Sequence, residues 1–384
     1  MLLPSTADDT IFDNIGPGDL IRYSRTCREA RDAVAAYSRR AFYLEGVLSR
    51  YFSPVQILKF RELQFETGAL ISGSTALQLL DRTYYENSDL DVYVAQRACK
   101  PIAFWLRSIG YKYVPRPRRS PFMQIVPELQ TLETALDYMS PHMPQILAID
   151  RERDDEHQFL DARDDGYSGG LNIYDFKKPN EEVKIQLFTT WQAPLECILN
   201  FHSTCVMNFI TYDKAISLYP QATFDQRRAL ACHPNWQGRR EAYAKYRNRG
   251  WKIIKKAWRL EAEDPDSPFV LGIRRVGDSK CWTVPICPKV DFPESTMEAN
   301  TWRLERHWHT RGPEMAFSVL KSPALASRYL VANSEIEGVI SGGLPESSSE
   351  GTWDAKLKEL VESHWELEVE QEKDEPIPEG EAWF

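Results

Sequence analysis

Hydrophobic and polar positions follow two different periods along the chain. Between residues 42 and 67 the apolar side chains recur every three or four positions, which predicts one or two helices with a buried face. Around residues 70 and 90 the apolar runs are short and bounded by turn-forming residues, which predicts strands. We therefore expect an α+β fold.

The later parts of the chain give further predictions of the same kind. Residues 101–110 form a short amphipathic pattern closed by glycine, which predicts a helix. Two apolar runs, 171–176 and 183–188, predict a hairpin, and residues 194–219 predict two helices. His202 lies among apolar residues there, so we expect a core or interface histidine, with a catalytic role as the alternative. Short apolar runs separated by turn residues predict a few strands in residues 268–333.

Acidic charge is concentrated near the C-terminus. The formal net charge is −9, and residues 335–384 alone hold fifteen Asp or Glu against three Lys or Arg, so the rest of the chain is slightly basic. This acidic tail is also rich in Gly and Ser, which predicts that it is largely disordered. Its one expected element is an isolated amphipathic helix that would use Trp353, Leu357, Leu360 and Trp365.

The composition also bears on the compartment. The sequence has no run of 18 apolar residues, and its N-terminus has no basic region followed by an apolar run, so we expect neither a membrane span nor a secretory signal. Seven scattered cysteines, an odd number, fit reduced thiols better than a disulfide framework. We therefore expect an intracellular protein, cytoplasmic or nuclear, without a membrane partner.

One stretch, residues 71–94, combines features of a phosphate site with features of a metal site. A predicted strand ends in a tight turn at Gly73 and Ser74, where backbone N–H groups at the start of a helix can bind phosphate. In the next predicted strand Asp89 and Asp91 are two positions apart, so both carboxylates lie on one face. Carboxylate oxygens are ligands that Mg²⁺ prefers, so the stretch is suited to metal-assisted phosphate chemistry.

This order of turn, helix and Asp-x-Asp strand resembles the nucleotidyltransferase superfamily of the polymerase-beta type. The resemblance covers roughly residues 65–215 and implies a mixed-sheet core that binds a nucleoside triphosphate with Mg²⁺ or Mn²⁺. It implies that the phosphates are held by Gly73, Ser74 and Ser88, and that the candidate catalytic residues and metal ligands are Asp89 and Asp91.

The same resemblance implies a third carboxylate on a later strand, where this chain has Gln186. A glutamine is neutral and cannot act as a general base. Asp175 on the preceding strand would substitute if the strand register differed. We favour a degenerate site, a pseudoenzyme that binds nucleotide; the alternatives are an active metal-dependent nucleotidyltransferase with a nucleic-acid or protein acceptor, and a carboxylate pair that only supports the turn.

The N-terminus carries a second motif, a Leu-Pro pair followed by two apolar positions and a Pro-x-Asp-Leu sequence. These residues resemble an F-box, which uncharacterised fungal proteins join to a nucleotidyltransferase-like domain, although Ala7, Asp8 and Ala30 depart from the family pattern. The resemblance implies a small helical bundle that docks on the Skp-type adaptor of a ubiquitin ligase through Leu3, Pro4, Ile11, Ile15, Pro17 and Leu20. The alternative is a helical cap that only packs on the next domain.

Residues 227–259 are strongly basic, with eleven Lys or Arg, one acid and interleaved aromatics. Such a composition fits a surface for nucleic acid or another polyanion. Its main candidates are Arg239, Arg240, Arg247, Lys252, Lys255 and Lys256. The alternatives are an amphipathic helix pair that buries Tyr243, Tyr246, Ile253, Ile254 and Trp258, and a surface that neutralises the acidic tail.

Four regions follow from these patterns. They are an F-box-like module (1–45), a nucleotidyltransferase-like domain (46–215), a basic helical and short-strand region (216–334) and the acidic tail (335–384). We expect an adaptor or interaction protein that binds nucleotide, and the active nucleotidyltransferase is the alternative.

Overall fold

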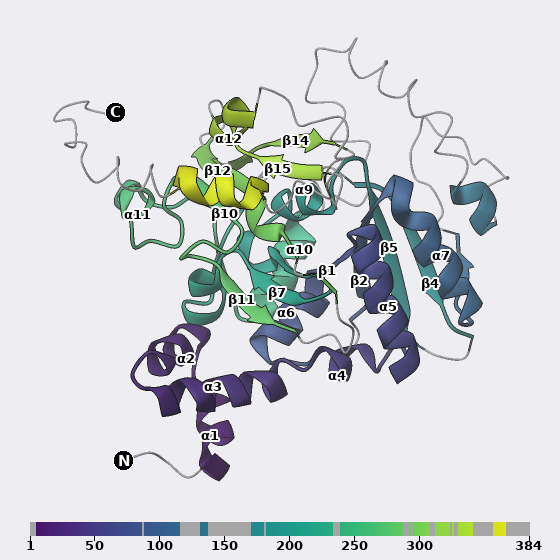
Figure 1. The fold of residues 1–384 in the computed structure, drawn as a ribbon, viewed down its shortest axis with the longest axis horizontal. Coiled ribbons are helices and arrows are strands. Elements are labelled where there is room, and N and C mark those ends of the chain that lie inside the picture. The colour runs from purple at the N-terminus through teal and green to yellow at the C-terminus, as the bar shows by residue number, and fades with distance from the viewer. Residues whose placement is uncertain are drawn as a thin grey trace.

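The computed structural model of the chain combines helices with one large mixed sheet (Figure 1). It describes residues 5–86, 88–115, 131–136, 170–179, 182–232, 239–286, 292–293, 295–307, 312–322, 325, 329–340 and 356–365. Leu3 and Pro4, two of the predicted adaptor-binding residues, lie outside the described residues, as does the side chain of Arg239. The α+β fold predicted from the sequence is confirmed.

The first part of the chain is helical. Its helices are α1 (Ser5–Phe12), α2 (Pro17–Ser24), α3 (Arg28–Ala41), α4 (Leu44–Leu48) and α5 (Pro54–Thr67). Local sequence explains where α5 starts and ends. Ser53 and Gln56 form a capping box at its start, and Gly68 ends the helix with a φ of 67°. The helices α4 and α5 confirm the prediction for residues 42–67.

The central sheet has eight strands in the order β11-β7-β6-β1-β2-β5-β4-β3. Their bounds are β1 (Leu70–Ser72), β2 (Leu90–Ala95), β3 (Lys112–Val114), β4 (Gly170–Lys177), β5 (Lys184–Thr190), β6 (Asn208–Ile210), β7 (Lys214–Ser217) and β11 (Trp282–Pro285). Strands β2 and β5 run parallel, and the other neighbouring pairs described in this sheet run antiparallel. The predicted hairpin is present as β4 and β5.

Helices and short turns surround this sheet. They are α6 (Gly73–Asp81), η1 (Gln96–Ala98), α7 (Cys99–Ser108), α9 (Pro194–Leu199), η4 (Thr204–Val206), the π-helix η5 (Gln221–Asp225), α10 (Arg239–Asn248) and α11 (Arg259–Glu263). Helix α6 packs against β1, β2 and β6, and α9 packs against β2 and β5. These contacts place α6 and α9 next to the strands that carry the predicted carboxylates (Figure 1).

Smaller sheets complete the C-terminal part. They are β10 (Gly272–Arg275) with β12 (Thr301–Arg306) and β13 (Pro313–Ala316), β14 (Ser318–Lys321) with β15 (Tyr329–Ala332), and the parallel pair β8 (Arg228–Leu230) and β9 (Lys252–Ile254). The turn η6 (Met297–Ala299) precedes β12, and α12 (Ser334–Ile340) follows β15. The strands predicted between residues 268 and 333 are thus present.

The predicted boundary at residue 215 falls within β7. Strand β11, which belongs to the predicted basic region, extends the same sheet by pairing with β7. One hydrophobic cluster also includes buried residues from Phe42 to Val331. The two predicted domains therefore share a sheet and a core, and their division into separate folding units stays a prediction.

Two helix predictions were wrong. The second helix expected within residues 194–219 is instead the hairpin of β6 and β7. Its turn is fixed by Thr211, whose hydroxyl bonds Asp213 and accepts from the N–H of Lys214, and the flanking β-branched and aromatic residues suit strands. The helix pair that was one alternative for residues 227–259 is also absent, since the described part of this stretch has one helix, α10, between β8 and β9.

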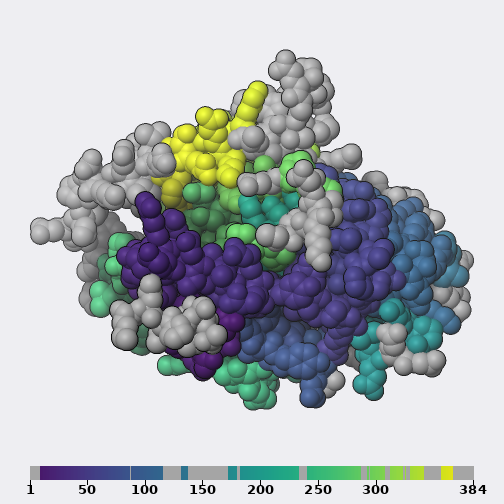
Figure 2. All heavy atoms as spheres, turned by 60° about the horizontal axis from the view of Figure 1, so that its bottom comes forward, coloured from purple at the N-terminus to yellow at the C-terminus, as the bar shows by residue number. Residues whose placement is uncertain are grey.

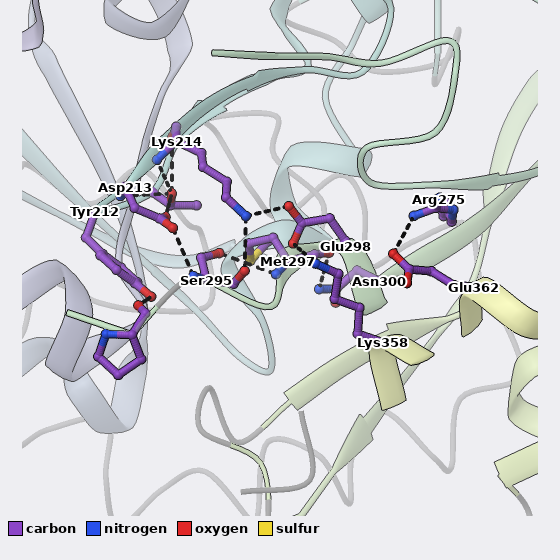
Figure 3. A network of polar contacts seen from close by, with 12 residues as sticks. Tyr212, Asp213, Lys214, Arg275, Ser295, Met297, Glu298, Asn300, Lys358 and Glu362 are labelled. Carbon is purple, nitrogen blue, oxygen red and sulfur yellow. Dashed lines mark hydrogen bonds and ion pairs between the residues drawn. The ribbon is translucent and has the colours of Figure 1, made fainter. Parts of the chain in front are cut away.

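The acidic tail contributes two helices to the structure. Helix α12 buries Ile336, and a helix at residues 356–365 buries Leu357 and Val361, so the expected amphipathic helix is packed rather than isolated. Figure 3 shows the ion pairs that hold the second helix: Lys358 faces Glu298 at 4.0 Å, and Glu362 faces Arg275 at 3.7 Å. Glu298 also pairs with Lys214 of β7 at 2.5 Å, which ties this region to the central sheet.

The N-terminal helices form a small cluster around Phe12, Leu20 and Tyr37. Arg82, which follows α6, donates hydrogen bonds to the Tyr37 hydroxyl and to the Ile15 carbonyl, both at 2.7 Å. The space-filling view shows these helices lying directly against the body of the molecule (Figure 2). The N-terminal module is thus attached to the end of the helix that begins at Gly73.

Candidate phosphate and carboxylate site

The turn between β1 and α6 is built on a glycine that no other residue replaces easily. Gly73 has a φ of 65°, and a Cβ there would lie 2.2 Å from the Oδ2 atom of Asp91. Two hydroxyl groups fix the flanks of the turn: Ser72 donates to the Asn208 carbonyl, and Thr75 donates to the Asp89 carbonyl at 3.0 Å. The predicted turn and carboxylate strand are therefore in direct contact.

Ser74 and Ser88 are both buried, and Gln78 connects them. The Nε2 of Gln78 donates to the Ser74 carbonyl at 3.0 Å and to the Ser88 hydroxyl at 2.9 Å. The Tyr51 hydroxyl donates to the Ser88 carbonyl at 2.7 Å. Ser88 is thus part of an internal hydrogen-bond network behind the turn, which weakens its predicted role as a phosphate contact.

Four polar residues lie next to one another where β2 and β5 pair: Asp89, Asp91, Lys184 and Gln186. The register aligns Asp91 with Gln186 and Leu90 with Ile185, and Asp89 and Lys184 directly precede this last pair. Asp89 Oδ2 lies 2.6 Å from the Lys184 ammonium. Because paired residues of adjacent strands point to the same face, all four side chains belong to one face of the sheet.

Gln186 separates Asp91 from the third carboxylate on this face. Asp175 of β4 aligns with Gln186, and the Gln186 amide donates to its Oδ1 atom at 2.9 Å. Two strand spacings, about 10 Å, thus separate the backbones of Asp91 and Asp175. The register therefore places Gln186 beside Asp91, with Asp175 one strand further away.

The candidate metal ligands are few. Among the residues that the structure describes, no group of three or more His, Cys, Asp or Glu side chains is arranged to hold a metal ion. Asp91 approaches the turn at Gly73, and Asp89 is already engaged by Lys184. A divalent cation that took both carboxylates as ligands would compete with that ammonium group for Asp89.

Helix α10 brings basic side chains to this site. Burial lowers the pKa of the Lys245 ammonium and the nearby Arg249 lowers it further, while Asp91 and Asp89 have smaller, opposing effects. The Arg249 guanidinium lies 3.7 Å from the ring centre of Tyr85, in the loop before Ser88. Arg249 is therefore close to the loop that leads to the carboxylates, and Lys245 lies one helical turn before it on α10, which the sequence did not predict.

His202 anchors α10 to the body. It is 5% exposed, its Nδ1 lies 2.8 Å from the Ser203 hydroxyl, and its ring contacts those of Tyr243 and Tyr246. Burial, with a smaller effect of Lys245, lowers its pKa to about 3. These contacts fit the core histidine expected from the sequence.

The predicted polyanion-binding residues lie on three elements. Arg240 and Arg247 are exposed on α10, Lys252 is exposed on β9, and Lys255 and Lys256 are exposed in the segment that follows. The alternative helix pair was to bury Trp258, but this side chain is 80% exposed, while Tyr243 and Tyr246 are buried as that alternative expected. A polyanion-binding role for this surface stays a prediction.

The described adaptor-binding candidates differ in exposure. Ile11 is 37% exposed, Ile15 is partly buried, and Pro17 and Leu20 are buried. Leu20 packs with Phe12 inside the N-terminal cluster. Of these four residues, Ile11 is therefore the most exposed, and Leu20 supports the module itself.

Sequence reasoning missed three cationic residues of the site: Lys184, Lys245 and Arg249. Lys184 could have been predicted from the sequence, because it precedes Gln186 by two positions in a strand and must lie on the same face. Lys245 and Arg249 come from the region of α10, far along the chain. The basic composition of that region does not indicate where the helix packs. Tertiary structure was needed to find them.

Comparisons with known proteins add no further identification. No protein-family model, no curated protein and no solved structure matches the chain. Within the described part of the chain, none of the helices has the length and apolar character needed to cross a membrane.

We predict that Gly73→Ala is more destabilising than Gly68→Ala. Both glycines have nearly the same φ (65° and 67°), so both changes introduce the same backbone strain, but a Cβ meets no heavy atom within 4 Å at Gly68. The contact with Asp91 should add about 1–3 kcal/mol to the loss for Gly73→Ala. Urea denaturation measures both, and the extra loss should disappear in an Asp91→Ala background; equal losses in the wild-type background would contradict the close approach.

We predict a histidine-dependent loss of stability in mild acid. The pKa of His202 falls from its ordinary value of 6.5 to about 3 on folding, so between these values the unfolded chain binds a proton that the folded chain does not. The free energy of unfolding should therefore be highest above pH 6.5 and fall by up to about 1.4 kcal/mol per pH unit below it. Urea denaturation at pH 7 and pH 5 should show a smaller difference for His202→Gln than for the wild type; identical differences would argue against a neutral buried imidazole.

Proposed function

We propose that this chain is an adaptor-type interaction protein whose nucleotidyltransferase-like domain binds a nucleotide without transferring it. The proposal rests on the residues that neighbour the two aspartates. Lys184 forms an ion pair with Asp89, and Gln186 is the strand neighbour of Asp91. Two-metal phosphoryl transfer needs anionic ligands that hold both ions and activate the attacking group. A face with an ion-paired aspartate and a neutral amide lacks that set.

The features that favour nucleotide binding are independent of metal. The turn at Gly73 places the start of a nine-residue helix, α6, at the site, where the helix dipole favours negative charge. Lys245 and Arg249 add positive charge from α10. These groups suit the phosphates of a nucleoside triphosphate, with Mg²⁺ or Mn²⁺ as an accompanying ion rather than a catalyst.

The N-terminal helices support the adaptor part of the proposal. They form their own hydrophobic cluster around Phe12, Leu20 and Tyr37, and they attach to the body through Arg82 and through α2, which contacts η5. Ile11 stays exposed on α1. A Skp-type adaptor is the partner that the F-box-like motif implies.

The first experiment asks whether the site turns nucleotide over. The wild type, incubated with each labelled nucleoside triphosphate and Mg²⁺ or Mn²⁺, should shift in melting temperature but transfer no label and release no pyrophosphate. Asp91→Asn serves as the matched control, since it keeps the size of the side chain and removes its charge. Label transfer by the wild type that Asp91→Asn abolishes would establish the alternative, an active nucleotidyltransferase.

The second experiment tests the adaptor surface. Ile11→Glu should abolish co-purification with a Skp-type adaptor, because it places a charge in the exposed apolar contact. Val55→Glu is the matched control, since Val55 is 77% exposed on α5, outside the N-terminal helices. Unchanged co-purification of the Ile11→Glu protein, or equal loss with Val55→Glu, would speak against docking through α1.

A further inference from the structure

The two most exposed large apolar side chains in the described part of the chain lie close together at the start of α11. Trp258 is 80% exposed and Leu260 is 84% exposed. Single exposed apolar residues are common on proteins, but large ones this close together are typical of an interaction surface. Figure 1 shows α11 at the left edge of the molecule, away from the central sheet, so a partner can reach it.

Contacts with the body fix the orientation of α11. Ala262 is buried, and its carbonyl accepts a hydrogen bond from the Leu271 N–H at 2.8 Å. Arg228 of β8 pairs with Glu261 at 2.7 Å, and its guanidinium lies 5.5 Å from the centre of the Phe269 ring. One side of α11 is therefore held against the body, and the exposed pair keeps a defined position in the solvent.

Charged side chains of opposite sign flank the exposed pair. Lys255 and Lys256 come before α11, Asp264 and Asp266 follow it, and all four are exposed. The charged side chains within α11 are already paired with one another or with the body. Lys280 donates to backbone carbonyls of the loop that holds the two aspartates, which reduces the negative charge there without cancelling it. The surface is thus basic at one end of α11 and acidic at the other.

The shape of this surface excludes a small ligand. Lys256 and Ala257, which come directly before Trp258, line a cavity of about 20 Å³ together with Phe269 and Leu271. Such a cavity holds about one water-sized group, whereas ligand pockets usually measure roughly 300–1,000 Å³. A partner must therefore cover the exposed pair from outside, as another protein surface does.

We propose that the α11 surface is an interface between two copies of this chain. The surface consists of Lys255, Lys256, Trp258, Leu260, Asp264 and Asp266. In a two-fold dimer the same surface faces itself, so each residue meets a different residue of the second copy. Two antiparallel α11 segments bring the basic end of each copy to the acidic end of the other, with the apolar side chains between them.

The charge pattern favours a second copy over a polyanion. A nucleic acid is attracted by the two lysines but repelled by the two aspartates, which lie only a short helix away. A second copy offers an opposite charge to both ends at once. The inference is independent of the proposed nucleotide site, which lies on other elements.

The first test is sedimentation equilibrium of the full-length protein over a range of concentrations. We expect a reversible monomer–dimer equilibrium with a Kd in the micromolar range, because an interface around one short helix is small. Trp258→Gln should raise the Kd by about tenfold or more, since a tryptophan at the centre of an interface supplies much of its affinity. Tyr84→Gln, which should leave the Kd unchanged, is the matched control, because Tyr84 is 73% exposed in the loop after α6.

The second test reverses the charges at one end at a time. Lys255→Glu with Lys256→Glu makes both ends acidic, and Asp264→Asn with Asp266→Lys makes both ends basic. The Asp264→Asn change keeps an acceptor for the Asp266 N–H, which donates to this side chain at 2.9 Å. Each double variant should stay monomeric where the wild type dimerises, because like charges meet in its homodimer. An equimolar mixture should form a heterodimer, because opposite charges then meet at both ends.

The outcomes are distinct. A wild type that stays monomeric at every concentration overturns the inference. A dimer that Trp258→Gln does not weaken overturns the assignment to the α11 surface. Double variants that do not associate when mixed overturn the antiparallel arrangement, whereas a heterodimer from two monomeric variants supports it, since a surface for nucleic acid has no reason to produce one.

Discussion

The parallel pairing of β2 with β5 fixes the composition of the candidate site. Leu90, Val92 and Val94 of β2 are fully buried, and their neighbours Ile185, Leu187 and Thr189 on β5 are buried as well. A slip of one residue would turn the aspartates toward this apolar side. The buried aliphatic residues therefore determine that Asp89 meets Lys184 and that Asp91 meets Gln186.

Helix α6 connects this site to the N-terminal module. It starts at Gly73, whose left-handed conformation and missing Cβ allow Asp91 to approach, and it ends before Arg82, which bonds Tyr37 and Ile15. Nine residues of helix span about 13 Å. The Gly73 turn therefore lies at one end of this short helix, and the contact with the N-terminal helices lies at the other.

Local patterns in the sequence predicted most elements of the first 200 residues. The helical period gave α4, α5 and α7, and the short apolar runs gave β1, β2, β4 and β5, because each of these elements buries a face that its own residues define. The sequence also identified Gln186 as the residue at the position where the resemblance implies a third carboxylate. Its relation to Asp175 could be tested only once the strand register was known.

Non-local packing decided the predictions that failed. Residues 208–217 are apolar enough for a helix or a strand, and pairing with β1 and β11 selects the strands. The exposed Trp258 and the packed helix at residues 356–365 likewise depend on neighbours that the sequence does not name. The position of α10 also depends on non-local contacts, because the rings of Tyr243 and Tyr246 pack against His202.

The pairing of β7 with β11 has a practical consequence for shortened forms of the protein. A fragment that ended near residue 215 would lack β11 and most of β7, so β6 would become the edge of the sheet. Phe209 and Ile210 of β6 are fully buried in the whole chain, and its open backbone would be available to a second molecule. Such a fragment should self-associate through this edge, so a shortened form that keeps the site must include β11.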